Sequence, residues 1–299
     1  MTVLILSQGK CGLSQGITHY MRAMATADLM VLIFSVIVNQ IIRNHFPGSP
    51  LNYTPICRLN VFLQGLSLQL SIWFTIAFTF DRFVAICCHK FKARYCTVST
   101  ANVVISTASM LNIMINIPLP FRYEPAYVVN SVQWGCRTIT SYHTSLAWAA
   151  HRWVTNISNA FLPIPLLLLL NSLTAQHILL ASRARQGLKS SSTSGARKLG
   201  KDAELKSRRT SIVLLFTISG CFVVLLMPIT LIHICVGVTQ TVAFQGSKSL
   251  YLAISATYLM MCTSSCTNTC IYALTQRRFR EELKNLVKSP FSLLCKLHE

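Results

Sequence analysis

Long apolar runs separated by short polar segments make up most of the chain. Each run is close to the roughly 20 residues that a helix needs to cross the hydrocarbon core of a bilayer. Buried helices of soluble proteins have shorter apolar stretches, and the alternation of a membrane β-strand is absent. We expect spans at about residues 23–42, 57–88, 101–120, 154–180, 209–238 and 249–274. The pattern therefore predicts an all-α membrane protein built as a helical bundle.

Composition and charge distribution agree with a membrane bundle. Hydrophobic residues make up 52% of the chain and charged residues only 12%, about half the share of charge in soluble domains. If the end of the second run that carries Arg82 is cytoplasmic, 21 of the 27 Lys and Arg residues fall on the cytoplasmic side. This positive-inside bias sets the orientation in the lipid bilayer. It also accounts for the net charge of +19 without nucleic-acid binding.

The second run has a cysteine at one end and an Asp-Arg pair at the other. A helix from Cys57 to Arg82 would be about 37 Å long, which places its two ends at opposite faces of the membrane. In this orientation Cys57 and Cys136 lie on the oxidising outer side, so they are the expected disulfide pair. Asn52-Tyr53-Thr54 is a glycosylation sequon in an outer loop, and it predicts a glycan on Asn52.

The two ends of the chain flank the bundle at 23–274. Residues 1–22 are interpreted as the end of a helix followed by an inner loop. Residues 275–299 form the tail, in which Gln276–Val287 predicts an amphipathic helix on the inner leaflet with Phe279 and Leu283 on its apolar stripe. Cys295, in a basic and apolar context, is either a palmitoylation site or a free cytosolic thiol.

Motifs that follow one another along the chain resemble those of a known receptor family. They are Ala25-Thr26-Ala27-Asp28, Cys57, Asp81-Arg82-Phe83, Cys136, Pro163, Pro228 and Asn268-Thr269-Cys270-Ile271-Tyr272. From Met21 to about Leu286 the chain resembles the rhodopsin-like (class A) G-protein-coupled receptors. The segments around Arg82 and Asn268 are most similar to the orphan group that contains G-protein-coupled receptors 139 and 142. Departures from the family pattern are Leu226 for tryptophan, Asn171 for tyrosine and Thr269 for proline.

The resemblance implies a receptor of the plasma membrane that passes an extracellular signal to a heterotrimeric G protein. It implies a seven-helix bundle, of which this chain holds six complete spans. We expect the missing part of the first helix to be encoded before Met1. The residues implied in coupling and switching are Asp81, Arg82, Phe83, Pro228, Asn268 and Tyr272.

Asp28 lies in the middle of a predicted span, where an unpartnered charge is costly. The resemblance implies that Ser71, Ser264, Ser265 and Asn268 converge on it. Oxygen ligands of this kind suit a small hard cation, so one interpretation is a sodium site. The other is a hydrated polar network around a protonated aspartate. No further cofactor is expected.

The resemblance places the ligand between the outer halves of the spans, beneath Cys136. The expected lining residues are Gln64, Leu68, His233, Tyr251 and Tyr258. An amine ligand would need an acid where Gln64 stands, so an amine is not expected. The orphan group implies an aromatic amino acid or a short peptide, and the outer arginines favour a ligand that carries a carboxylate.

Two other functions are compatible with parts of the pattern. A transporter or channel would need polar residues along the whole bundle, whereas here they concentrate around Asp28 and Arg82. A chain without its first helix could also be a nonsignalling receptor fragment. An enzyme is not predicted, because no GxGxxG, GKS/GKT or HExxH motif or spaced Cys/His set is present.

Overall fold

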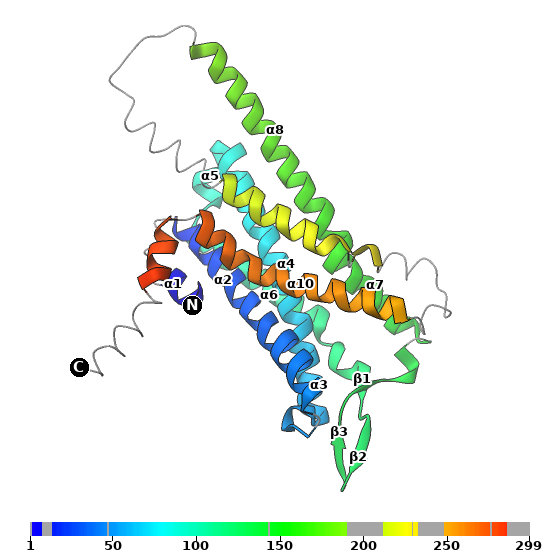
Figure 1. The fold of residues 1–299 in the computed structure, drawn as a ribbon. Coiled ribbons are helices and arrows are strands. Elements are labelled where there is room, and N and C mark those ends of the chain that lie inside the picture. The colour runs from blue at the N-terminus through cyan, green and yellow to red at the C-terminus, as the bar shows by residue number, and fades with distance from the viewer. Residues whose placement is uncertain are drawn as a thin grey trace, which may run out of the picture.

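A computed structural model describes residues 2–7, 14–46, 48–142, 144–189, 212–228, 230–232, 248–275 and 277–285. Six long helical segments lie side by side and form a bundle (Figure 1). Five of the described helices are long and apolar enough to cross a membrane. The helix Lys248–Thr275 has the length but is not among the five, because many hydroxyl residues interrupt its apolar sequence.

The helical segments follow one another in the order of the predicted spans. The first four are α1 (Thr2–Ser7), α2 (Gln15–Val31) with its π-helical continuation Leu32–Ile42, α3 (Arg43–His45) and α4 (Thr54–Cys87). Next are α5 (His89–Tyr95), α6 (Val98–Asn116), α7 (Leu146–Asn156), the π-helical turn Ile157–Phe161 and α8 (Pro163–Lys189). The last are the helix Ile212–Ile232, α10 (Lys248–Thr275) and a short helix at 277–285.

The structure corrects the prediction that residues 1–22 are only a helix end and a loop. Gln15–Arg22 already form the first turns of α2, which starts after Ser14 in an extended conformation. These turns are amphipathic: Ile17, Tyr20 and Met21 are buried. A search for uninterrupted apolar runs misses them because their outward-facing side chains are polar.

The span Leu146–Ala181 changes its helical geometry in front of Pro163. The Leu162 backbone N–H bonds to the carbonyl of Ile157, five residues earlier, with a distance of 3.0 Å. Proline has no N–H to continue the normal ladder, so a π-helical turn at this point satisfies part of the backbone. The segments α7, Ile157–Phe161 and α8 nevertheless form one continuous span, Leu146–Ala181.

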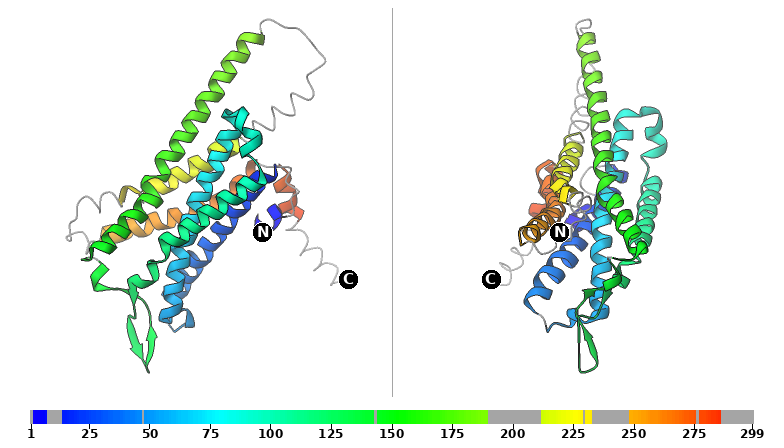
Figure 2. Two further views of the ribbon diagram at one scale, coloured as in Figure 1. Left: turned by 180° about the vertical axis from the view of Figure 1, so that it is seen from behind. Right: turned by 90° about the vertical axis from the view of Figure 1, so that its right-hand side faces the viewer.

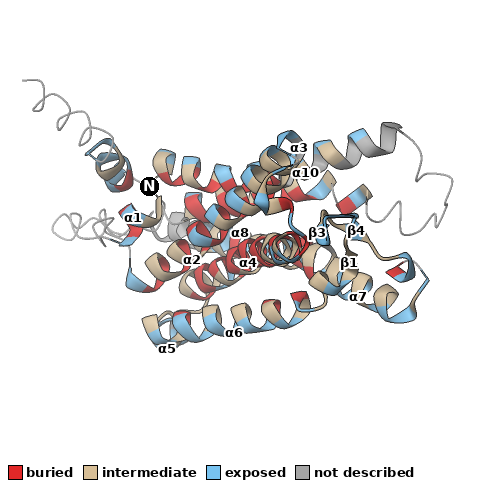
Figure 3. Cartoon of the chain, turned by 90° about the horizontal axis from the view of Figure 1, so that it is seen from below, coloured by how far each residue is buried: buried red, intermediate tan, exposed pale blue. Residues whose placement is uncertain are grey.

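Helix α4 lies at the centre of the bundle and packs against α2, α6 and α8 (Figure 3). Its buried face runs from Cys57 to Val84. In contrast, α6 is peripheral and exposes large apolar side chains such as Val103, Met110 and Met114. An outward-facing apolar surface suits contact with lipid rather than water. The described helices therefore form a bundle with α4 in its interior and an apolar outer surface that suits contact with lipid.

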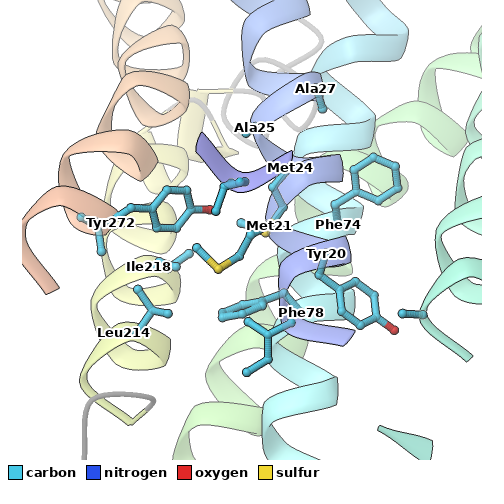
Figure 4. Close-up of a cluster of buried hydrophobic side chains, with 14 of the residues drawn as sticks. Tyr20, Met21, Met24, Ala25, Ala27, Phe74, Phe78, Leu214, Ile218 and Tyr272 are labelled. Carbon is cyan, nitrogen blue, oxygen red and sulfur yellow. The ribbon is translucent and has the colours of Figure 1, made fainter. Parts of the chain in front are cut away.

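The apolar core joins four helices at one end of the bundle. Met21 and Met24 from α2 meet Phe78 from α4, Ile218 from the helix Ile212–Ile232 and Tyr272 from α10 (Figure 4). The short helix α1 adds Ile5 and Leu6, both fully buried. Its Thr2 hydroxyl lies 3.1 Å from the Thr269 hydroxyl of α10. Helix α1 therefore connects the packing of α2 with that of α10.

The opposite end carries a loop with two small antiparallel strand pairs, which the all-α prediction did not include. β1 (Tyr123–Glu124) pairs with β4 (Arg137–Thr138), and β2 (Tyr127–Val129) pairs with β3 (Val132–Trp134). The β2–β3 hairpin projects beyond the helices (Figure 2). Its turn uses Asn130 and Ser131 at φ of 50° and 64°, and positive φ at both central residues is what a two-residue type I′ hairpin turn requires.

A disulfide joins this loop to the start of α4, as predicted. Cys57 and Cys136 are bonded with their Cα atoms 6.3 Å apart. The Thr54 hydroxyl, one turn before Cys57, donates to the carbonyl of Gly135 at 2.9 Å. We call this end of the bundle the outer end and the end with Arg82 the inner end, following the charge bias of the sequence.

Candidate functional site

At the inner end, Arg82 is buried and paired with its neighbour Asp81. The guanidinium Nε lies 3.1 Å from the Asp81 carboxylate, and Nη2 contacts the same oxygen. Phe83 is half-buried, with its ring 6.3 Å from that of Phe80. The Cys96 thiol, just outside the membrane span, donates to the Asp81 carbonyl at 3.6 Å. Burial raises the pKa of this thiol to about 11, and the Asp81 carboxylate adds to the effect. Cys96 is therefore a neutral neighbour of the ion pair.

In the middle of the bundle, three helices meet at Asp28. The Ser71 hydroxyl of α4 donates to one carboxylate oxygen at 2.6 Å. The side-chain amide of Asn268 in α10 donates to the other at 2.9 Å. Ser265 also interacts with the carboxylate, and both Ser264 and Ser265 are buried. The structure thus brings together the predicted polar residues around a buried carboxylate.

An apolar layer lies between the Asp28 network and Arg82. On α4, Ser71 and Arg82 are eleven residues apart, or about 16 Å along the helix axis. Phe74 and Phe78 lie between them and are buried in the core cluster. Tyr272 points from α10 into this layer (Figure 4), and its buried hydroxyl has no hydrogen-bond partner among the described residues. The two polar groups are consequently separated by packed side chains.

In the outer half, two of the expected pocket residues contact each other. The Gln64 amide of α4 donates to the Tyr258 hydroxyl of α10. Leu68, one turn deeper on α4, is half-buried. The side chain of Tyr251 and the whole of His233 lie outside the described residues. The outer half therefore provides a polar bridge across the bundle, at the level where the ligand is expected.

The sequence of the chain also matches a model of a known protein family. The model of the 7 transmembrane receptor (rhodopsin family) matches residues 1–272. The chain belongs to the rhodopsin family of seven-transmembrane receptors. It is a multi-pass plasma-membrane receptor with a signalling role and not an enzyme. The family implies an extracellular ligand and a G protein as partners, and the match favours a receptor over a transporter.

The receptor buries the asparagine of the glycosylation sequon. Asn52 is 7% exposed, and its side-chain nitrogen donates to the carbonyl of Phe46 at 3.1 Å. Its own carbonyl accepts a bond of 2.7 Å from the backbone N–H of Gly135. A glycan would be attached to the buried nitrogen, so this conformation opposes the predicted modification. The sequon identifies Asn52 as an acceptor residue, but it does not indicate whether the side chain is buried in the folded protein.

The remaining predicted positions lie in the last part of the chain, from Pro228 onward. Pro228 is half-buried within the helix Ile212–Ile232. Phe279, in the helix at 277–285, is fully buried and packs edge-on against Tyr272, with ring centroids 5.9 Å apart. Leu283 packs against the same core. Cys295 lies outside the described residues.

Sequence reasoning missed three polar contacts between helices. The Asn171 side chain of α8 bonds Ser219 of the helix Ile212–Ile232, at 2.8 and 3.0 Å. The Trp73 indole N–H of α4 donates to the Ser158 hydroxyl at 3.1 Å. The Asn116 amide of α6 donates to Gln69 of α4. Each is a polar side chain within an apolar run, and that position was the available signal, because such residues turn inward.

Proposed function

We propose that the receptor activates a heterotrimeric G protein by releasing Arg82 from Asp81 when an extracellular ligand changes the helix packing. The observation that carries this proposal is the buried Arg82–Asp81 pair, which is closed off by the apolar layer above it. An ion pair between sequence neighbours is held locally and needs no second helix. Exposure of the guanidinium therefore depends on movement of the surrounding helices.

The helix Ile212–Ile232 is the element best suited to make this movement. It contributes Leu214, Leu215 and Ile218 to the apolar layer, next to Tyr272. If its inner end moves outward, the layer opens and Arg82 becomes accessible from the cytoplasm. The Tyr272 hydroxyl can then gain the hydrogen-bond partner that it lacks in the closed packing, which offsets part of the cost of opening.

The test of coupling uses purified receptor in lipid nanodiscs and nucleotide exchange on purified G proteins. Asp81→Asn removes the charge that holds Arg82, so basal exchange should rise several-fold. Asp81→Asn combined with Arg82→Ala should return exchange to the level of G protein alone. Arg277→Ala is the matched control, because Arg277 is an exposed inner arginine paired with Glu281.

Equal basal exchange in wild type and Asp81→Asn would contradict the release mechanism. A folded receptor that stimulates no exchange in any of these forms would favour the nonsignalling alternative.

We further propose that the ligand is an aromatic amino acid or a short peptide, in line with the resemblance to the orphan group of receptors 139 and 142. The support in the structure is the Gln64–Tyr258 bridge, a neutral hydrogen-bonding pair in place of a carboxylate. Such a pair can exchange its mutual bond for bonds to ligand amide or amine groups. A panel of L-amino acids tested on wild type and Gln64→Leu should show activation by aromatic members that the variant weakens about tenfold. An unresponsive wild type would overturn this choice of ligand.

We propose sodium as the regulator of the polar network. Asp28, Ser71, Ser264 and Ser265 could hold the cation, since carboxylate and hydroxyl oxygens are the ligands that hard cations prefer. Sodium would supply positive charge to a buried carboxylate and so stabilise the closed packing. The melting temperature of purified receptor should be higher in sodium chloride than in equal potassium chloride. Asp28→Asn should abolish the difference, and a difference that survives in this variant would exclude the site.

A further inference from the structure

Two arginines at the outer end stack on the same tyrosine. Tyr142, in the 3-10 turn Thr140–Tyr142, is 7% exposed. The guanidinium carbon of Arg122 lies 3.9 Å from the centre of its ring, and that of Arg152 lies 4.9 Å away. Arg122 comes from the turn after α6 and Arg152 from α7. The outer loop thus brings two positive charges to one aromatic ring.

Neither charge is neutralised by an acid. Of the eight acidic residues in the chain, Glu124 is the only one on the outer side. Glu124 is already paired with Arg137 at 2.8 Å. Arg152 donates one hydrogen bond to the neutral carbonyl of Tyr142. The ring partly compensates both cations, but their mutual repulsion has no carboxylate to oppose it in the described part of the chain.

The arginines also retain hydrogen-bond donors. The Nε of the Arg122 guanidinium is a buried atom with no hydrogen-bond partner among the described residues. The five N–H groups of a guanidinium form a planar fork of donors, and contact with a ring face does not use them as conventional hydrogen-bond donors. This fork of donors matches the paired oxygens of a carboxylate. The ring therefore orients the two forks while leaving them able to bind an anion.

We propose that Arg122 and Arg152, held by Tyr142, form an oxyanion site that binds the carboxylate of an extracellular ligand. The site would take a small organic acid with an apolar body, since the rings of Tyr123 and Tyr142 contact the guanidinium groups and Trp148 packs against Tyr142. This inference deepens the proposed function, because it assigns the ligand one chemical group. It does not depend on coupling to a G protein.

The experiment measures binding directly on purified receptor in a maltoside detergent. The probes are 3-phenylpropionate and its uncharged amide, 3-phenylpropionamide, at equal ionic strength. The carboxylate should raise the melting temperature in a saturable way, and the amide should not. Arg122→Gln and Arg152→Gln should each weaken the apparent affinity about tenfold, because each removes one charged fork. Arg137→Gln is the matched control, as Arg137 is an outer arginine already paired with Glu124.

Further variants and lipids distinguish the outcomes. Arg122→Lys and Arg152→Lys keep the charge, so intermediate affinity in these variants supports the fork geometry even if a glutamine variant fails to fold. Equal effects of acid and amide on the melting temperature, or an equal loss of affinity in Arg137→Gln, would overturn the proposed site.

In phosphatidylcholine nanodiscs the effect of the carboxylate on the melting temperature should persist. Its loss in lipid but not in detergent would assign the site to headgroup phosphate and overturn the ligand assignment. Failure of nucleotide exchange with intact binding would contradict only the proposed coupling.

Discussion

Gly65 is a residue at which the absence of a side chain sets the distance between two helices. A Cβ atom added there would lie 2.6 Å from Leu119 Cδ1 and 2.8 Å from Asn116 Oδ1. Leu119 has a flexible tip, but Asn116 is buried and held by bonds to Gln69 and to the carbonyl of Asn112. Asn116 therefore cannot move aside without breaking polar contacts inside the membrane. The close approach of α4 and α6 depends on this glycine.

Gly65→Ala should lower the stability of the receptor by about 1–3 kcal/mol, the usual cost of overpacking. The measurement is the melting temperature of purified receptor in detergent. Gly220→Ala is the matched control, since Gly220 lies in another span with nothing within 4 Å of its added Cβ. Equal melting temperatures for Gly65→Ala and Gly220→Ala would show that α6 adjusts without cost.

At the scale of helices, polar side chains decide which spans are tied together. Asn171 and Ser219 connect α8 to the helix Ile212–Ile232, and Ser219 is fully buried. Because lipid offers no hydrogen bonds, separation of the two helices leaves these groups unsatisfied. The family's usual tyrosine is absent at Asn171, and the amide connects the same helix that we propose to move. This contact should therefore favour the closed packing.

Asn171→Leu and Ser219→Ala should each raise basal nucleotide exchange on the G protein, because the helix Ile212–Ile232 loses an anchor. Each change should cost about 1 kcal/mol of closed-state stability. The double variant should add little to either single variant, since both remove the same contact. Thr230→Ala controls for loss of a buried hydroxyl, as the Thr230 hydroxyl donates to the Leu226 carbonyl of its own helix and to no other described residue. Fully additive effects in the double variant would argue against a shared contact.

At the scale of the whole molecule, the disulfide closes a long loop at one end of the bundle. Cys57 and Cys136 are 79 residues apart in the chain. The closed loop includes α4 from Cys57 onward and all of α6, and the bond holds the β-strand loop against the start of α4. A disulfide lowers the conformational entropy of the unfolded chain, and it does so more when the loop that it closes is long. The outer end should therefore depend on this bond more than the inner end does.

Cys57→Ala, Cys136→Ala and the double variant should lower stability by similar amounts, about 2–4 kcal/mol. Surface expression and melting temperature measure the effect, and non-additivity identifies the loss of one shared bond. Cys266→Ala is the control, because Cys266 is a free, exposed cysteine of α10. A Cys136→Ala variant as stable as wild type would show that packing alone holds the loop.

Several features could be predicted because they depend on local sequence. A helix that crosses the lipid must be predominantly apolar for about 20 residues. Each apolar run therefore indicates a span, whatever helices pack against it. Cys57 and Arg82 fall at opposite ends of one such run, so the charge bias places Cys57 on the outer side with Cys136 and the Asp81-Arg82 dipeptide at the inner end. Arg82 bonds its own sequence neighbour Asp81, so the ion pair depends on no distant contact.

Other features depend on contacts between residues far apart in the chain, and only the tertiary structure decided them. Asn52 belongs to a sequon, yet its side chain bonds Phe46 and is buried beneath the outer loop. Arg122 and Arg152 are outer arginines in the sequence, and only the folded loop brings both onto Tyr142. Apolar periodicity determined where the spans lie, because burial in lipid acts on each helix separately. Packing determined which polar groups meet, because each of those contacts needs two helices or a helix and a loop.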